Sequence, residues 1–217
     1  MIDVRMFTVG PVQENCFIVR ASSSATSAVI VDPGEEADRL LEALDALGIT
    51  KLEAILLTHT HFDHVGAVAP VAKATGAPVW CPELEVPVLA DIMAYVPWPG
   101  FGPFESYDAD HTVKGGEELE LAGLTLDVIF TPGHSPGHVT YSVRGERALL
   151  AGDVLFQGSI GRTDLPGGDM QTLMQSIDLL LSTHDDETTV YPGHMGLTTL
   201  GRERASNPFL QGLARNL

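Results

Sequence analysis

Histidine and aspartate residues are spaced along the sequence in a way that could hold metal ions. Three imidazoles and a carboxylate fall within six residues, in His59-Thr60-His61-Phe62-Asp63-His64. Packed together without a metal, these side chains would cost several kcal/mol in lost hydration unless all were hydrogen-bonded. A divalent cation removes that cost because it supplies the missing charge. In a turn, His59 and His61 can point one way and Asp63 and His64 another, which favours two metals over one.

Three further candidate ligands each follow a predicted strand and a glycine. They occur in Thr131-Pro132-Gly133-His134, Ala151-Gly152-Asp153 and Tyr191-Pro192-Gly193-His194. Glycine and proline allow the backbone to turn sharply there and bring each ligand toward the same point. Nitrogen and oxygen donors favour zinc, iron or manganese over copper or an iron–sulfur cluster. The complete predicted set is His59, His61, Asp63, His64, His134, Asp153 and His194.

Three other histidines are set aside as ligands. We expect His138, four residues after His134, to support the site through a hydrogen bond. We expect His111 to be exposed in a long loop. His184 is expected to end a helix, where a cationic side chain suits the helix dipole.

The elements that must position these motifs alternate between strands and helices. Periodicity and turn signals predict a helix over residues 37–47, another over 65–75 and an amphipathic one over 170–181. A short helical tail is expected after His194. Strands are predicted around residues 17–19, 29–31, 54–57, 124–130, 139–143, 148–150 and 188–191.

Residues 97–116 are rich in glycine, proline and aromatic residues and show no period, so we expect a long loop. Two interpretations of its aromatic residues remain open. They could line the mouth of a substrate cavity, or the loop could pack down on them. The residues concerned are Trp98, Phe101, Phe104 and Tyr107.

Length and charge limit the classes of function. The 217 residues, 44 % of them hydrophobic, suit one compact domain. The formal net charge of −17 argues against a nucleic-acid partner, and an anionic substrate would need a local basic anchor. Cys16 and Cys81 are too few and too distant to suggest a disulfide framework. With no apparent signal peptide and no run long enough to span a membrane, we expect a cytoplasmic protein with a small-molecule substrate.

The motifs THTHFDHVG, TPGHSPGH, AGD and YPGH, in this order, resemble the metallo-β-lactamase fold superfamily. Within it, GSIGRTDLPGGD at residues 158–169 and the ending GHMGLTTLGRERASNPFL resemble the short glyoxalase II-like hydrolases. The resemblance covers nearly the whole chain. It implies an α/β fold, an αββα sandwich with the site at the edge where the two sheets meet. Residues 1–217 would form a single domain without the helical C-terminal domain of full-length glyoxalase II.

The resemblance also implies a role for each ligand. His59, His61 and His134 would hold one metal, Asp63, His64 and His194 a second, and Asp153 would bridge them. Zinc is the expected metal, with iron or manganese as alternatives. A hydroxide between the two metals would attack a thioester carbonyl, such as that of S-2-hydroxyacylglutathione. Asp63 and Asp153 would be the catalytic carboxylates.

Substrate binding departs from full-length glyoxalase II. The basic glutathione contact of that enzyme falls on Arg162, and its substrate-contacting tyrosine falls on Asp164. Arg162 could anchor a substrate carboxylate or form an ion pair with Asp164 that stiffens the loop. Two alternative functions stay open. One is a mononuclear-iron persulfide dioxygenase, which the chain resembles around Gly161-Arg162-Thr163-Asp164, and the other is a lactone or ester hydrolase of the same fold.

Overall fold

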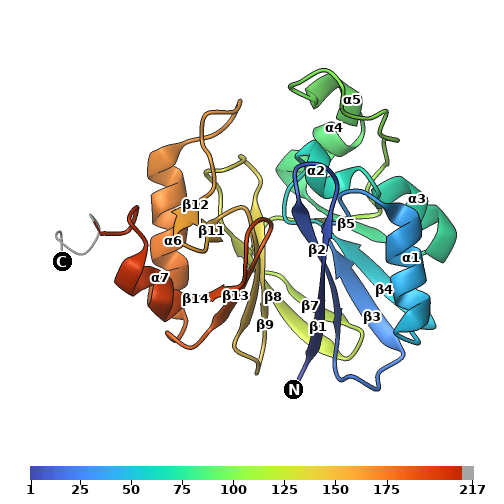
Figure 1. The fold of residues 1–217 in the computed structure, drawn as a ribbon, viewed down its shortest axis with the longest axis horizontal. Helices are drawn as coiled ribbons and strands as arrows, with labels where there is room; N and C mark the ends of the chain where they lie inside the picture. The colour runs from blue at the N-terminus through green and yellow to red at the C-terminus, as the bar shows by residue number, and fades with distance from the viewer. Residues whose placement is uncertain (212–217) are drawn as a thin grey trace.

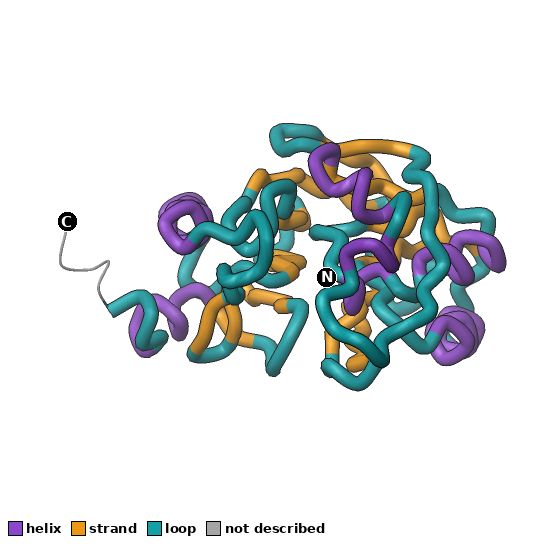
Figure 2. The backbone as a smooth tube through the Cα atoms, turned by 90° about the horizontal axis from the view of Figure 1, so that it is seen from above, coloured by secondary structure: helices purple, strands orange, loops and turns teal. Residues whose placement is uncertain are grey.

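A computed structural model describes residues 1–211 as two β-sheets packed face to face, with helices on both outer sides (Figure 1). Viewed from above, the helices flank the strands on both sides, and loops gather over the ends of the sheets (Figure 2). This is the predicted αββα sandwich.

The first sheet has six strands in the order β1-β2-β3-β4-β5-β6. Helices α1 (Ala37–Ala46) and α3 (Val68–Thr75) cover its outer face, where Leu40 and Val71 pack against Ile30 and Ile55. The strands are β1 (Asp3–Val9), β2 (Glu14–Arg20), β3 (Ser27–Val31), β4 (Lys51–Leu56), β5 (Val79–Pro82) and β6 (His111–Val113).

The second sheet follows the order β14-β13-β10-β9-β8-β7. Helices α6 (Met170–Thr183) and α7 (Leu200–Ser206) cover its outer face, and Leu173 and Ile177 of α6 pack against Leu149 and Val190. Among the described residues, no helix combines the length and apolar character needed to cross a membrane. The strands are β7 (Glu118–Leu121), β8 (Leu124–Phe130), β9 (Val139–Val143), β10 (Ala148–Gly152), β13 (Thr189–Pro192) and β14 (Thr198–Thr199).

The central apolar layer lies between the sheets. Phe17 and Val19 of β2 face Leu126, Tyr141 and other residues of the second sheet. Ile18 of β2 points to the opposite side, toward the helices. Because both faces of the strand are covered, all seven residues of β2 are buried.

The strand order brings the ligand motifs to one edge of the sandwich. Strands β4, β8, β10 and β13 each end directly before one of the motifs. Strand β10 pairs parallel to β13 and antiparallel to β9, which in turn pairs antiparallel to β8, so β8, β10 and β13 all point the same way. The loops after these strands therefore meet in the upper part of Figure 1, near α2 (Phe62–Val65).

Two predictions about the elements are wrong in detail. The helix expected over residues 65–75 begins only at Val68, as α3, and the one-turn helix α2 precedes it, because the chain turns at Gly66 and Ala67. A side chain at Gly66 would collide with the carbonyl oxygen of Gly34 and the ring of Phe104, so this turn requires glycine. The loop expected over residues 97–116 ends in β6, which pairs with β5.

Several short elements were not predicted. They include the one-turn helices α4 (Val86–Leu89) and α5 (Ile92–Tyr95), which follow the 3₁₀ turn Glu83–Glu85. The hairpin of β11 (Leu155–Phe156) and β12 (Ser159–Ile160) was also missed. Each spans too few residues to show a hydrophobic period.

Candidate metal centre

Three of the predicted ligands form a first cluster, His59, His61 and His134. The Nδ1 atom of His61 lies 3.1 Å from Nε2 of His59 and 2.8 Å from Nε2 of His134. His59 and His61 come from the loop after β4, and His134 comes from the loop after β8. The three nitrogen atoms converge on one point, which is the arrangement that a single cation needs.

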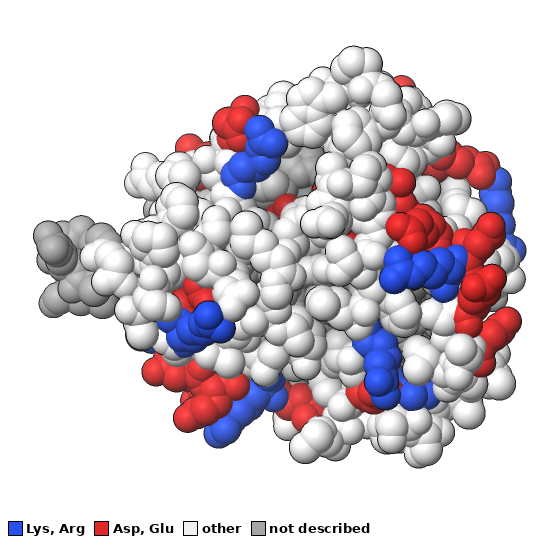
Figure 3. Space-filling model, in the orientation of Figure 1, with Lys and Arg blue, Asp and Glu red and all other residues white. Residues whose placement is uncertain are grey.

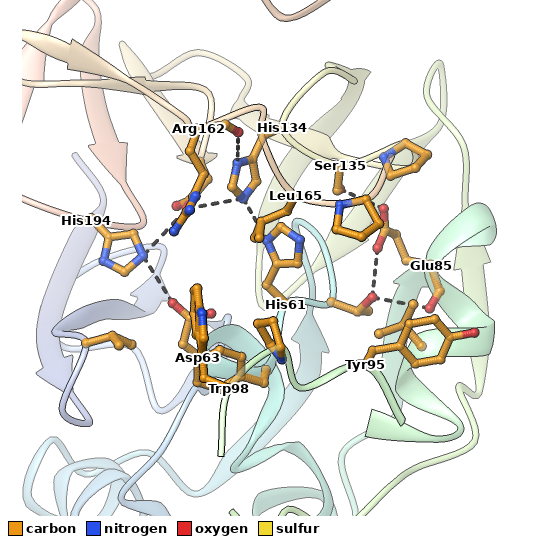
Figure 4. A pocket seen from close by; sticks show the side chains of 18 of the residues that line it. His61, Asp63, Glu85, Tyr95, Trp98, His134, Ser135, Arg162, Leu165 and His194 are labelled. Carbon is orange, nitrogen blue, oxygen red and sulfur yellow. Dashed lines mark hydrogen bonds and ion pairs between the residues drawn. The ribbon is translucent and has the colours of Figure 1, made fainter. Parts of the chain in front are cut away.

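Three more ligands form a second cluster, Asp63, His64 and His194. The Oδ2 atom of Asp63 lies 3.3 Å from Nε2 of His194 and 3.9 Å from Nε2 of His64. Asp63 and His64 lie on α2, and His194 follows β13. Figure 4 shows His194 and Asp63 beside one another, each reaching the cavity from a different element.

Asp153 lies between the two clusters. Its Oδ2 atom is 3.4 Å from Nε2 of His134 in the first cluster and 3.6 Å from Nε2 of His194 in the second. Its Oδ1 atom is 3.5 Å from Nε2 of His64. The structure thus brings all seven predicted ligands together, with one carboxylate facing both clusters.

The donor atoms fit divalent cations. Within the described residues, Nε2 of His64 and Oδ1 of Asp153 are buried and have no hydrogen-bond partner. A buried polar atom without a partner costs about 1–3 kcal/mol, so atoms of this kind usually mark a bound ion or water. Imidazole nitrogens and carboxylate oxygens are the ligands that zinc, iron and manganese accept.

Hydrogen bonds at the far side of the rings set which nitrogen faces the cavity. Nδ1 of His134 donates to the carbonyl oxygen of Arg162 (2.8 Å), and Nδ1 of His194 donates to the carbonyl oxygen of Gln13 (3.3 Å). A carbonyl oxygen only accepts, so the hydrogen lies on Nδ1. Each Nε2 atom therefore faces the cavity, where it can bind a metal once any proton on it has been released.

Asp32 orients two further rings, those of His64 and His59, through the same principle. Its Oδ2 atom accepts from Nδ1 of His64 (3.1 Å) and from Oγ1 of Thr58 (2.6 Å). Because the Thr58 hydroxyl donates to Asp32, it accepts from Nδ1 of His59, 3.1 Å away. One buried carboxylate thus orients a histidine in each cluster.

The two clusters differ in charge. Burial, together with neighbouring histidines, lowers the pKa of His59 well below its usual value and that of His61 to about 4, so both rings are neutral at pH 7. Burial opposes the charged form of His64 and His194 as well, but Asp153 and Asp63 outweigh it and raise both pKa values. The same attraction outweighs burial at Asp153 and lowers its pKa.

The positions predicted for His138 and His184 are confirmed, whereas His111 is exposed as predicted but lies in a strand and not in a loop. His138 is fully buried, and its Nε2 atom accepts a hydrogen bond from the backbone N–H of Asp153 (3.0 Å). It therefore supports the position of Asp153. His111 is exposed at the start of β6, and His184 directly follows α6.

Glu85 is a supporting residue that the sequence did not reveal. Its Oε1 atom accepts from Oγ of Ser135 and from the backbone N–H of Gly137, both at 2.7 Å. Its Oε2 atom accepts from Oγ1 of Thr60 at 2.8 Å. Glu85 therefore ties the loop of His59 and His61 to the loop of His134 (Figure 4). It follows an irregular stretch, and nothing in its spacing points to the motifs.

Two more supporting residues come from the β1–β2 hairpin and were also missed. The side-chain amide of Asn15 donates to the carbonyl oxygens of Pro192 (3.1 Å) and Met195 (2.8 Å), which flank His194. Glu14 is fully buried, and its Oε1 atom lies 3.7 Å from Nδ1 of His64. Burial raises the pKa of Glu14 well above its usual value. Both lie in a strand that reads as an ordinary apolar run.

A cavity of about 700 Å³ opens over both clusters. Figure 3, in the orientation of Figure 1, shows a hollow in the upper part of the molecule, surrounded mostly by uncharged side chains. Arg162 lies at the cavity, and both Nε and Nη2 donate to the carboxylate of Asp164 at 2.7 Å. Its guanidinium also lies 5.5 Å from the centre of the Trp98 ring. The ion pair with Asp164 is thus present, and Arg162 also lines the cavity.

The aromatic residues of the 97–116 loop divide between the two expected roles. Trp98 lines the cavity. Phe101 and Phe104 pack against Phe62, with ring centres 4.8 Å and 5.8 Å away, and Tyr107 packs on the same apolar core.

Comparison with known proteins identifies the family of this arrangement. The family model of the metallo-beta-lactamase superfamily matches residues 9–194, which include all seven ligands. The probable metallo-hydrolase YqgX of Bacillus subtilis (strain 168) is 40 % identical, over 97 % of this chain and 98 % of that protein. The hydroxyacylglutathione hydrolase GloC of Haemophilus influenzae is 35 % identical, over 96 % of this chain and 98 % of that protein.

Solved structures agree with these sequence relatives. The BLEG-1 B3 metallo-beta-lactamase is 40 % identical with a TM-score of 0.90, over 97 % of this chain and 100 % of that chain. TTHA1623, solved in a di-iron-bound form, is 40 % identical with a TM-score of 0.83, over 95 % of this chain and 100 % of that chain.

Proposed function

The chain belongs to the metallo-beta-lactamase superfamily, and we propose that it hydrolyses thioesters of the glutathione type, with S-2-hydroxyacylglutathione as substrate. Its family and its relatives make it a metal-dependent hydrolase. The proposal concerns the substrate and the role of each residue.

The observation that carries the proposal is the position of Asp153 between two complete ligand clusters. We assign one divalent ion to the first cluster and one to the second, with Asp153 as the shared ligand. Zinc is the metal proposed first. TTHA1623 was solved with two irons, which makes iron the alternative to test.

Bound at these clusters, divalent ions supply a water of lowered pKa and polarise a carbonyl group. The residues of this chain do the rest. Asp63 lies at the cavity, where its carboxylate can accept a hydrogen bond from the attacking water and orient it. Water adds to the carbonyl carbon, the carbon–sulfur bond breaks, and a carboxylic acid and a thiol are released. A thiolate is a good leaving group and needs little help from a general acid. This suits a site whose motifs supply no additional Glu or Lys for that role.

The thioester class rests on two further observations. GloC, a relative of full matching length, is named as a hydroxyacylglutathione hydrolase. Arg162 lies at the cavity beside Trp98, where it could contact a carboxylate of glutathione.

Two other reactions would use the same fold. A persulfide dioxygenase would hold a single iron through two histidines and an aspartate, keep the residues of the second cluster, and consume oxygen. A lactone or ester hydrolase would share the metals and differ in substrate. Metal stoichiometry separates the first alternative from hydrolysis, and a substrate panel separates the second.

The test is metal analysis of the purified protein together with a hydrolysis assay on S-lactoylglutathione. Two metal ions per chain with turnover of the thioester is the expected result. One iron per chain, no thioester hydrolysis and oxygen uptake with glutathione persulfide would overturn the proposal in favour of the dioxygenase.

A further inference from the structure

We propose that the cavity selects its substrate mainly through a large apolar acyl group, and only weakly through the thiol carrier. This inference rests on the proposed thioester hydrolysis and adds the acyl class to it. The acyl group would pack on an apolar wall beside the metal ligands. We define this wall as the cavity-lining residues Leu84, Val88, Ile92, Tyr95, Pro97 and Trp98.

The wall is a continuous apolar surface from neighbouring elements. It begins in the 3₁₀ turn Glu83–Glu85, continues through α4 and α5, and ends in the loop after α5. Several of its side chains face solvent, with exposures of 62 % for Leu84, 55 % for Tyr95 and 41 % for Trp98. Exposed apolar side chains grouped at a cavity usually mark a binding surface. A substrate that covers them gains the free energy of removing apolar area from water.

The charges of the cavity give a thiol carrier little to bind. Among the described residues that line it, Arg162 is the one lysine or arginine. Two of its three guanidinium nitrogens, Nε and Nη2, already donate to Asp164, so its positive charge is paired before any substrate carboxylate arrives. The net charge of −17 adds long-range repulsion for an anionic carrier such as glutathione.

The two ends of the substrate have different places. In Figure 4, Arg162, His194 and Trp98 lie on one side of His61, and Tyr95 and Glu85 lie on the other. A thioester with its carbonyl carbon over the clusters would extend in both directions. If the carrier lies toward Arg162 and Trp98, the acyl group lies toward the part of the wall that carries Tyr95.

The first experiment compares two acyl groups on two carriers, with the metal-loaded protein. The acyl groups are lactoyl and 2-hydroxyoctanoyl, which differ by five methylene groups, and the carriers are glutathione and uncharged N-acetylcysteamine. Each methylene that the wall removes from water raises kcat/KM about fourfold, so burial of three predicts a gain of roughly 60-fold. Changing the carrier should alter kcat/KM by less than about fivefold.

The outcomes separate this inference from the proposed function. Hydrolysis that is equal for both acyl groups, or that depends mainly on the carrier, would overturn the inference and leave thioester hydrolysis intact. Hydrolysis of none of the four compounds would overturn the proposed function. The inference would then be tested by the binding of two thioethers that cannot be hydrolysed, S-methylglutathione and S-octylglutathione. A clear preference for the octyl compound in calorimetry supports the wall, and equal binding refutes it.

Substitutions within the wall locate the effect. Leu84→Gln keeps an exposed position exposed and should reduce the preference for the longer acyl or alkyl group about fivefold. Leu197→Gln is the matched control, because Leu197 is also exposed (41 %) and does not line the cavity. An unchanged preference in Leu84→Gln, or an equal loss in both variants, would contradict binding at the wall.

Discussion

Glu85 offers the sharpest test of how the first cluster is held. It is 3 % exposed and accepts three hydrogen bonds, at 2.7, 2.7 and 2.8 Å, from the two loops that carry His59, His61 and His134. Glu85→Gln keeps the shape of the side chain and removes its charge. Oε1 then accepts its two bonds as a neutral amide oxygen, and the amide nitrogen that replaces Oε2 must donate to Oγ1 of Thr60. Exchanging the three charge-assisted bonds for neutral ones lowers the free energy of unfolding by about 1 kcal/mol per bond and about 3 kcal/mol in all. Glu85→Ala leaves the three donors without a partner and should lower the free energy of unfolding further.

The assay is urea unfolding of the metal-free protein, followed by zinc titration against a competing chelator. In Glu85→Gln the free energy of unfolding should fall by about 3 kcal/mol. We also expect zinc affinity at the first cluster to fall by about 10–100-fold, because loosened loops no longer hold the three histidine nitrogens together. Glu83→Gln is the control, since this exposed neighbour has no side-chain hydrogen bond within the described residues. Stability and zinc affinity of Glu85→Gln that match those of Glu83→Gln would refute the reasoning.

The remaining predictions concern the ligands and their supports. Asp153→Ala should abolish metal content and turnover, and near-normal rates would contradict the assignment of Asp153. Arg162→Ala should raise KM for a glutathione thioester by up to about fivefold, without changing metal content or the KM for an N-acetylcysteamine thioester. If KM is unchanged for both thioesters, the ion pair with Asp164 has a purely structural role. The raised pKa values of His64 and His194 mean that metal must displace protons there, so affinity at the second cluster should rise with pH by about tenfold per unit for each proton released. Calorimetry in two buffers counts those protons, and no release would contradict the charge state. Asn15→Ala should weaken metal binding at the second cluster alone by about tenfold, measured by chelator competition, and an equal loss at both would contradict separate support.

The fold was predictable where apolar periods are long. Helices α1 and α6 were expected from their spacing, and strands such as β8 from their apolar runs. The break between α2 and α3 was not, because the helical period runs through Gly66 and the reason for the turn is a close contact with Gly34. A contact between segments so far apart in the sequence leaves no local signal.

The metal ligands were predictable because their chemistry is concentrated in motifs. Buried imidazoles and carboxylates after strand ends are hard to explain without a cation, so residue type and spacing were sufficient. The supporting carboxylates were not predictable in this way. Asp32 reads as part of an ordinary turn with Pro33 and Gly34, and Glu85 reads as a surface glutamate. Their roles depend on which loops the sheets bring beside them.

The supports of the two clusters come from different parts of the chain. Glu85 ties the loops of the first cluster together, whereas the second depends on the β1–β2 hairpin, where Asn15 bonds to both sides of His194. The backbone N–H of Asn15 also donates to the carbonyl oxygen of Gly193 (2.7 Å). The carboxylate of Asp153 lies against both clusters, and that of Asp32 bonds to His64 directly and reaches His59 through the Thr58 hydroxyl. Coupling between the metals should therefore pass through these two carboxylates, while the outer supports act on one metal each.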